Sequence, residues 1–364
     1  MFSRRKTPSD PNARRLVVHI GDHKTGTTSI QTAFARGDVT LNGADVFYPG
    51  NVAHNYLRRH VRAYHAGTDG DKSAEAVEMF EQLARRIRRK GAQYSLLSAE
   101  ALEETPPKAL RKVLETFFAK SVDETWVVAY VRPHAGRLAA SFVERTKIGL
   151  PTASLESFAT ESIAARKFHY HTRFSTWRKA FGDRFVLRPA IRSQLTERSA
   201  VHDLVRHGFG REDFSVAPTG AANESLSLPD LMRLKALHGA LREVPQTVRH
   251  SIGWEFLRLT GVRPGPNDAA RVYLCRALMD QIHDAYLKDA KAMDRDFFDG
   301  QPLLQTDLEE ARAKAPVEAL SVDPADHLSA SEMRSVALMA DMVASLVQSD
   351  AEDWTKFLRQ KRVS

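Results

Sequence analysis

The sequence contains almost no cysteine and no long apolar run. Its single cysteine, Cys275, excludes a disulfide within the chain and cannot form a metal cluster by itself. We therefore expect a reducing, cytoplasmic setting. No segment approaches the roughly 18 apolar residues of a membrane-spanning helix, so no transmembrane segment is predicted. Residues 1–13 begin with basic residues but lack the apolar run of a signal peptide, and we expect a disordered leader.

Patterns for metal binding and for nucleic-acid binding are missing as well. The 14 histidines are scattered and no HExxH pattern occurs, so no metal site is predicted. The formal net charge of +8 favours an anionic ligand. The densest basic run, residues 85–90, lies in an amphipathic helical pattern, where such runs are typical of a solvated face. We therefore expect a nucleotide-sized anion as ligand and no nucleic-acid partner.

The most informative stretch is a loop between an apolar run and a helix start. Leu16–Ile20 has the composition of a buried strand, and Thr27–Ser29 are typical first residues of a helix. Gly21 and Gly26 permit a tight turn between them. Backbone N–H groups and the positive end of the helix dipole then converge, which predicts a phosphate site to which Lys24 adds a full charge. Four loop residues add hydroxyl donors: Thr25, Thr27, Thr28 and Ser29.

The residue order in this loop distinguishes between kinds of phosphate site. A Walker A loop ends in Gly-Lys-Ser/Thr, whereas Lys24 precedes Gly26 here. Residues 19–31, His-Ile-Gly-Asp-His-Lys-Thr-Gly-Thr-Thr-Ser-Ile-Gln, resemble the 5′-phosphosulfate-binding loop of sulfotransferases that use 3′-phosphoadenosine 5′-phosphosulfate (PAPS), in their bacterial branch. The resemblance implies that His23 and the residues from Lys24 to Ser29 bind PAPS, and that the chain has a P-loop NTPase-like sulfotransferase fold.

Strand and helix patterns alternate through the first two thirds of the chain. Besides residues 16–20, strand patterns occur at residues 44–48, 94–97, 125–131 and 184–187, with helical patterns between them. The alternation predicts an α/β protein with a parallel β-sheet flanked by helices. From Leu228 onward only helical patterns occur, including residues 268–288 and 329–347. We predict a sulfotransferase domain at residues 14–305 and a helical C-terminal extension at 306–364.

A second element of a PAPS site must hold the 3′-phosphate. In the family, an arginine that ends a strand and a serine on the next helix do so, and Arg132 matches the arginine. The usual spacing places the serine where this chain has Ala140, and Ser141 follows one residue later. One residue rotates a helical side chain by about 100°, so Ser141 serves only if the preceding turn absorbs the extra residue. Residues 223–226 resemble an Asn-x-Ser-Leu motif of the bacterial branch, with a helix cap as the alternative.

Sulfuryl transfer requires charge stabilisation and a base. Lys24 and the loop N–H groups would stabilise the leaving phosphate, so no metal is required. Glu100 follows the strand at 94–97, and Ser-x-Glu at this place resembles the bacterial branch, which makes Glu100 the first candidate base. The alternative is a carboxylate favoured by a helix dipole. His54 is the second candidate, with a structural histidine as its alternative.

The resemblance implies a sulfotransferase that moves the sulfuryl group of PAPS to a hydroxyl, or an amine, of a carbohydrate-containing acceptor such as a glycan or glycolipid. The product nucleotide is adenosine 3′,5′-bisphosphate (PAP). Two other functions stay open: a kinase-like P-loop protein, which would depend on magnesium, and a non-catalytic protein that binds PAP or PAPS. The sequence identifies neither the acceptor nor the oligomeric state.

Overall fold

The computed structural model describes residues 13–23, 25–50, 52–67, 70–218, 226–263, 265, 269–349 and 356. The chain divides into two compact units, each made of several segments. Unit 1 comprises Met1–Pro133, His169–Gly220 and Lys288–Gln305. Unit 2 comprises His134–Phe168, Ala221–Leu287 and Thr306–Ser364. The domain boundaries expected at residues 13 and 305 stay predictions.

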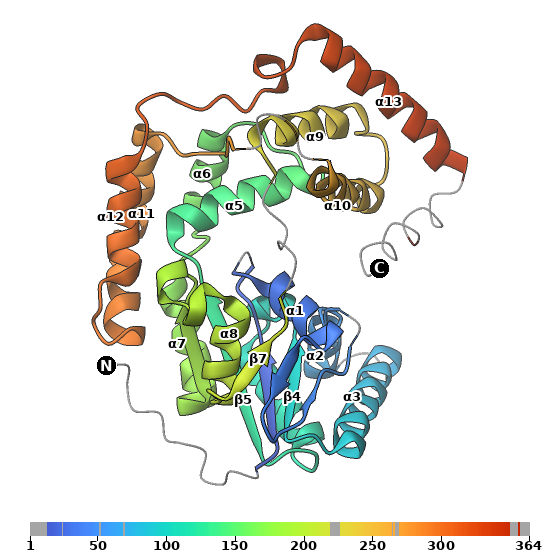
Figure 1. Cartoon of the computed structure of the whole chain (residues 1–364), viewed down its shortest axis with the longest axis vertical. Helices are drawn as coiled ribbons and strands as arrows, with labels where there is room; N and C mark the ends of the chain where they lie inside the picture. Colours follow the sequence, from blue (N-terminus) through green and yellow to red (C-terminus); the bar gives the residue numbers. More distant parts are fainter. Residues whose placement is uncertain are drawn as a thin grey trace. The chain divides into compact units, whose positions relative to one another are not determined.

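Unit 1 is organised around a five-stranded sheet (Figure 1). All neighbouring strands pair in parallel, which confirms the predicted α/β class with a parallel sheet flanked by helices. Every residue of the central strand β1 is buried, as expected where helices cover both faces of a sheet. The strand order is β3 (Val46–Phe47), β4 (Tyr94–Ser98), β1 (Arg15–His19), β5 (Glu124–Val131) and β6 (Phe185–Pro189).

Helices of unit 1 bury their apolar faces against this sheet. Ile30 and Phe34 of α1 pack in one core cluster with Val17 of β1 and Val128 of β5. On α7, Trp177 and Phe174 stack on Phe185 of β6. The helices of unit 1 are α1 (Thr27–Arg36), α2 (Leu57–Ala66), α3 (Gly70–Lys90), α4 (Pro107–Val113), α7 (Tyr170–Phe181) and α8 (Ala200–Leu204).

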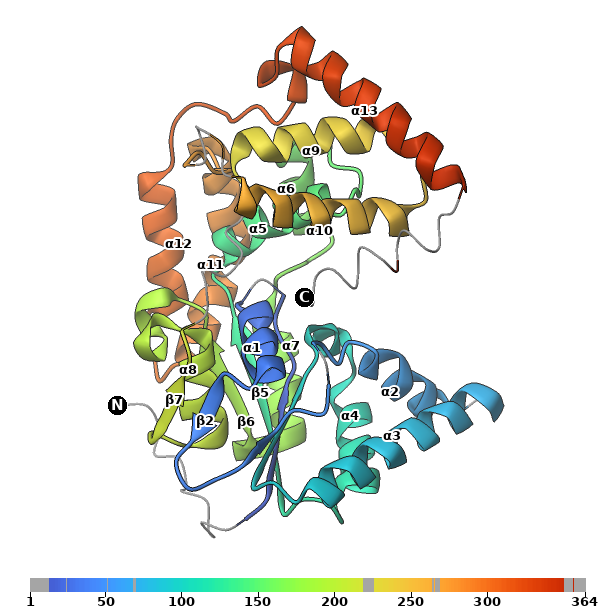
Figure 2. The same ribbon diagram turned by 45° about the vertical axis from the view of Figure 1, so that its right-hand side comes forward.

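A small second sheet in unit 1 has no counterpart among the predicted elements. Strands β2 (Val39–Leu41) and β7 (Phe214–Val216) pair antiparallel, side by side in Figure 2. Each has three residues, which is too short for an alternating pattern to stand out from a loop. Val39 and Leu41 point into the same core cluster as α1, so this sheet extends the apolar layer that holds α1 in place.

All the regular elements in the described part of unit 2 are helices. Its helices are α5 (His134–Lys147), α6 (Leu155–Ala164), α9 (Leu228–Ala240), α10 (Gln246–Val262), α12 (Leu303–Lys314, from Thr306 on) and α13 (Ala330–Ser349). Helix α11 (Arg276–Phe297) has residues in both units. It begins later than the predicted 268–288, because residues 270–275 form no regular element and the carbonyl of Ala270 accepts the N–H of Leu228. Of the helices described, none is both long and apolar enough to cross a membrane.

Candidate functional site

The β1–α1 loop lies at the carboxyl edge of the sheet in unit 1. The last residue of β1, His19, lies opposite Ser98, the last residue of β4. Beyond β1 the chain continues along β5, and the N–H of Asp22 donates to the carbonyl of Tyr130 at 2.9 Å. The loop is therefore adjacent to the ends of both neighbouring strands, the place where open α/β sheets bind their ligands.

Two glycines determine the path of this loop. Gly26 directly precedes α1 with a φ of +91°, and a β-carbon there would lie 2.8 Å from Cβ of Ala200. Gly21 has a φ of +89°, and its β-carbon would lie 3.1 Å from Cα of Glu100. Both positions combine a left-handed backbone with a close approach to another element, so only glycine fits them without displacement.

The N-terminus of α1 has the features of an anion site. Among the described residues, no side chain caps this terminus and no acidic residue lies in its first turn. The first N–H groups of a helix lack intrahelical partners and carry the positive end of its dipole. Thr28 is exposed and Ser29 half-buried, whereas Thr25 is buried and its hydroxyl donates to the carbonyl of Asp22 at 2.5 Å. The buried hydroxyl of Thr27 lies 3.5 Å from the same oxygen.

The predicted hydroxyl donors thus divide into two groups. Thr25 and Thr27 hold the loop, while Thr28 and Ser29 lie in the first turn of α1, where Thr28 is exposed and Ser29 is half-buried. Lys24 lies outside the described residues, and so do the first three residues of the motif at 223–226. Their assigned roles stay predictions.

Replacing Gly26 with alanine tests this loop geometry. We expect Gly26→Ala to lower the free energy of unfolding by about 2–4 kcal/mol, because it adds a contact with Ala200 to the cost of a left-handed backbone. Gly37→Ala, at the other end of α1, is the matched control. Gly37 has a φ of +75° with nothing within 4 Å, so only the backbone cost, about 1 kcal/mol, applies. Equal losses in chemical denaturation would contradict the close approach of Gly26 to α8.

His23 and Glu100 come together at the rim of the loop. Nδ1 of His23 lies 3.4 Å from Oε2 of Glu100, and their side chains are 38% and 30% exposed. Glu100 begins the 3₁₀ turn η1 (Glu100–Glu104) directly beyond β4. Glu100 is thus an accessible carboxylate next to the loop, and its role as a general base stays a prediction.

His54, the second candidate base, lies in a different environment. It is fully buried, and its Nδ1 accepts the backbone N–H of Ser98 at 3.2 Å. Burial lowers the pKa of His54 to about 4, against the smaller opposing effect of hydrogen bonding with the backbone of Ser98 and Pro49. The imidazole is therefore neutral at pH 7 and supports the end of β4. Its role as a base stays a prediction, but this geometry favours Glu100.

Three charged residues behind the loop, Asp22, Glu103 and Arg173, were not predicted from the sequence. The backbone N–H of His23 donates to Oδ1 of Asp22 at 2.8 Å and to Oε2 of Glu103 at 3.0 Å. Arg173 donates through Nη2 to Oδ2 of Asp22 at 3.0 Å, and its Nη1 lies 3.7 Å from Oε1 of Glu103. Asp22 and Glu103 are 1% and 9% exposed. Arg173 comes from α7, about 150 residues away, so local sequence carries no signal for this cluster.

The two residues assigned to the 3′-phosphate belong to different units. Arg132 directly follows β5 in unit 1 and is half-buried. Ser141 lies on α5 in unit 2, where its hydroxyl accepts a hydrogen bond from Nη1 of Arg137 at 2.7 Å. Joint binding of one phosphate by Arg132 and Ser141 stays a prediction.

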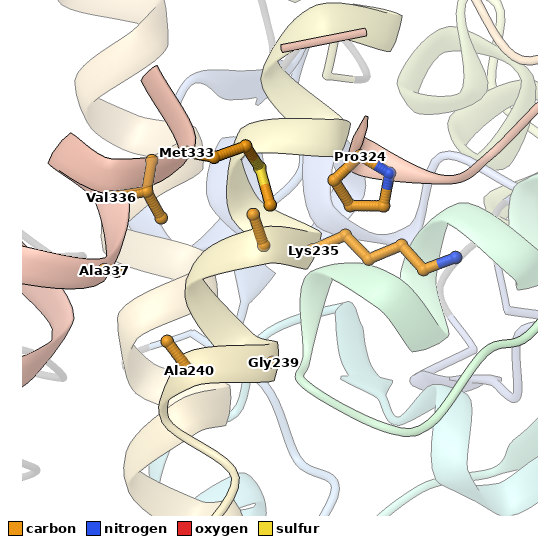
Figure 3. A pocket seen from close by; sticks show the side chains of 8 residues that line it. Lys235, Gly239, Ala240, Pro324, Met333, Val336 and Ala337 are labelled. Carbon is orange, nitrogen blue, oxygen red and sulfur yellow. The ribbon is translucent and has the colours of Figure 1, made fainter. Parts of the chain in front are cut away.

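A pocket of about 410 Å³ lies within unit 2, between α9, α13 and Pro324 (Figure 3). Its walls are mainly apolar, with the side chains of Met333 and Val336 from α13. Its charged residue, Lys235, donates through Nζ to the carbonyls of Ala153 and Val322 at 3.0 and 2.7 Å. The ammonium group of Lys235 is thus hydrogen-bonded to the backbone of unit 2, and the residues that line the pocket lack the converging polar groups of an active site.

Comparisons with known proteins do not assign the chain to a family. The chain matches no protein-family model, no curated protein and no solved structure. In the part of the chain that the structure describes, no group of three or more His, Cys, Asp or Glu side chains could hold a metal ion.

Proposed function

We propose that this chain is a cytoplasmic PAPS-dependent sulfotransferase with a P-loop NTPase-like sulfotransferase fold. The observation that carries the proposal is the combination of an uncapped N-terminus of α1 with an accessible carboxylate, Glu100, beside the same loop. The residue order, with Lys24 before Gly26, does not match a Walker A loop, and it resembles the 5′-phosphosulfate-binding loop of the sulfotransferase family.

In this proposal the β1–α1 loop binds the 5′-phosphosulfate. The N–H groups at the start of α1 and the hydroxyls of Thr28 and Ser29 donate to its oxygens, and Lys24 balances the charge that develops on the leaving phosphate. Arg132 binds the 3′-phosphate, since its guanidinium can form two parallel hydrogen bonds to a phosphate. Cationic and dipolar groups thus stabilise the leaving group, and no metal ion takes part.

The chemical step is an in-line displacement at sulfur. The acceptor hydroxyl, on a glycan or glycolipid, attacks the sulfur while the bond from sulfur to the 5′-phosphate oxygen breaks. Glu100 accepts the hydroxyl proton, and PAP leaves with the electron pair of the broken bond. The products are a sulfate ester, PAP and a protonated Glu100, which loses its proton to solvent. An amine acceptor follows the same course.

Turnover tests this function and separates it from its alternatives. The protein is incubated with PAPS and a panel of carbohydrate acceptors in the presence of a metal chelator. PAP is expected to be released under these conditions, and only when an acceptor is present. Hydrolysis of ATP that requires Mg²⁺ would instead support the kinase-like function. Tight PAP binding without turnover of any acceptor would support the non-catalytic function.

A further inference from the structure

We propose that Glu103 is a positioning residue that holds the β1–α1 loop, and that a bound anion favours its neutral carboxylic acid form, so that anion binding near and above neutral pH is accompanied by proton uptake. This inference rests on the anion site of the proposed function, but not on sulfuryl transfer itself. It concerns a side chain that lies behind the loop and touches no substrate.

The contacts of Glu103 fix the loop at one point. Its Oε2 accepts the backbone N–H of His23 at 3.0 Å, together with Oδ1 of Asp22 at 2.8 Å. His23 lies three residues before Gly26 and four residues before Thr27, the first residue of α1. A shift of the His23 backbone would therefore move the N–H groups that the proposed function assigns to the anion.

The charges around Glu103 favour its neutral form. It is 9% exposed and is faced by Asp22 and His23 from the loop and by Arg173 from α7, with Glu100 on its own turn. Burial raises the pKa of Glu103. The Asp22 carboxylate and a hydrogen bond between the two carboxyl groups raise this pKa further. Arg173 and His23 lower it, but their effects are smaller than those that raise it. One guanidinium, 3.0 Å from Asp22 and 3.7 Å from Glu103, thus pairs mainly with Asp22.

A neutral Glu103 also serves an anion site. A second buried carboxylate behind the loop would repel a phosphate or sulfate bound in front of it, and burial weakens the screening of that repulsion. Protonation of Glu103 therefore strengthens anion binding, and by linkage a bound anion strengthens protonation by the same factor. Near and above neutral pH, binding must then take up protons.

Calorimetric titration with PAP on wild type and Glu103→Gln tests this coupling. Glutamine retains an oxygen for the N–H of His23 but cannot ionise. The binding enthalpy in buffers of different ionisation enthalpy measures proton uptake, and wild type is expected to take up protons when PAP binds above neutral pH. As the pH rises, the affinity of wild type for PAP is expected to fall, by about tenfold in total for each unit by which bound PAP raises the pKa of Glu103. Glu103→Gln is expected to bind with little dependence on pH, without this uptake, and more tightly than wild type at high pH.

The neighbouring residue provides the control. Glu104 is half exposed and pairs with Arg58, so Glu104→Gln is expected to behave as wild type. Equal proton uptake by Glu103→Gln and wild type would overturn the proposal. So would a Glu103→Gln variant that binds more weakly at every pH, because a charged carboxylate would then be required.

Unfolding measurements keep the test independent of the proposed function. A group whose pKa is raised on folding contributes stability that is lost as the pH rises through the folded-state pKa. The stability of Glu103→Gln relative to wild type is therefore expected to increase from acidic to mildly alkaline pH, even if PAP does not bind. If PAP fails to bind and this trend is present, the anion site is wrong and the neutral carboxyl is right. If the trend is absent, Glu103 is ionised and the proposal fails.

Discussion

Glu100→Gln is expected to lower the turnover of PAPS by about 10²- to 10⁴-fold, the usual contribution of a general base. Glutamine has nearly the same shape but cannot accept the acceptor's proton. PAP affinity is expected to change by no more than about twofold, because the side chain contributes to the chemical step rather than to nucleotide binding. Steady-state kinetics of PAP release and calorimetry with PAP measure the two effects separately.

His54 provides the discriminating comparison. Its buried ring accepts a backbone N–H from β4, so His54→Gln is expected to reduce stability rather than to abolish turnover in the fraction that remains folded. If His54→Gln abolished turnover in well-folded protein while Glu100→Gln retained it, the assignment of the base would be reversed.

Asp203→Asn is expected to lower the free energy of unfolding by about 3–5 kcal/mol, because it leaves a buried guanidinium without its counter-ion. Asp203 lies on α8 and is fully buried. Its Oδ2 accepts from Nε of Arg188 at 3.0 Å and from the Tyr130 hydroxyl at 3.1 Å, and its Oδ1 accepts from Nη2 of Arg188 at 2.9 Å. The pair therefore ties β5 and β6 to α8. Chemical denaturation measures the loss.

Asp213→Asn is the matched control for this change. Asp213 pairs with Arg211 at the surface, with its side chain 54% exposed, so the expected loss is below about 1 kcal/mol. Burial alone would raise the pKa of Asp203, but hydrogen bonds and charge from Arg188 outweigh burial and lower it. The stability that Asp203 contributes is thus present at neutral pH and lost as the pH falls through its folded-state pKa. If the difference in free energy of unfolding between wild type and Asp203→Asn did not shrink in acid, the buried ion pair of Asp203 with Arg188 would be contradicted. Equal losses of stability for Asp203→Asn and Asp213→Asn would also contradict it.

The elements that position the site could be predicted because their patterns are local. The apolar runs at residues 16–20, 94–97 and 125–131 became β1, β4 and β5, and the predicted helix start at Thr27 is the first residue of α1. Helix α6 was missed, although Ser154 and Ser157 form a capping box at its start. The partner residue is serine rather than glutamate or glutamine, which weakens that signal in sequence.

The interactions behind the loop could not be predicted because they join distant segments. Asp22 lies three residues beyond the end of β1 and Glu103 lies in η1, and both resemble surface carboxylates until the chain is folded. Only folding brings Arg173 from α7 to them. His54 illustrates the reverse case, since its place after a strand suggested access to the site, while burial against the end of β4 determines its environment.

The most direct test of the central claim is calorimetric titration of the β1–α1 loop site with PAP, with and without Mg²⁺, beside ATP. We predict tight PAP binding that is independent of the metal and that Arg132→Ala weakens by about 1.5–3 kcal/mol, the range for a hydrogen bond to a charged group. Arg36→Ala, exposed at the far end of α1, is expected to bind as wild type. Binding of ATP only with Mg²⁺, and indifference to PAP, would contradict the sulfotransferase account.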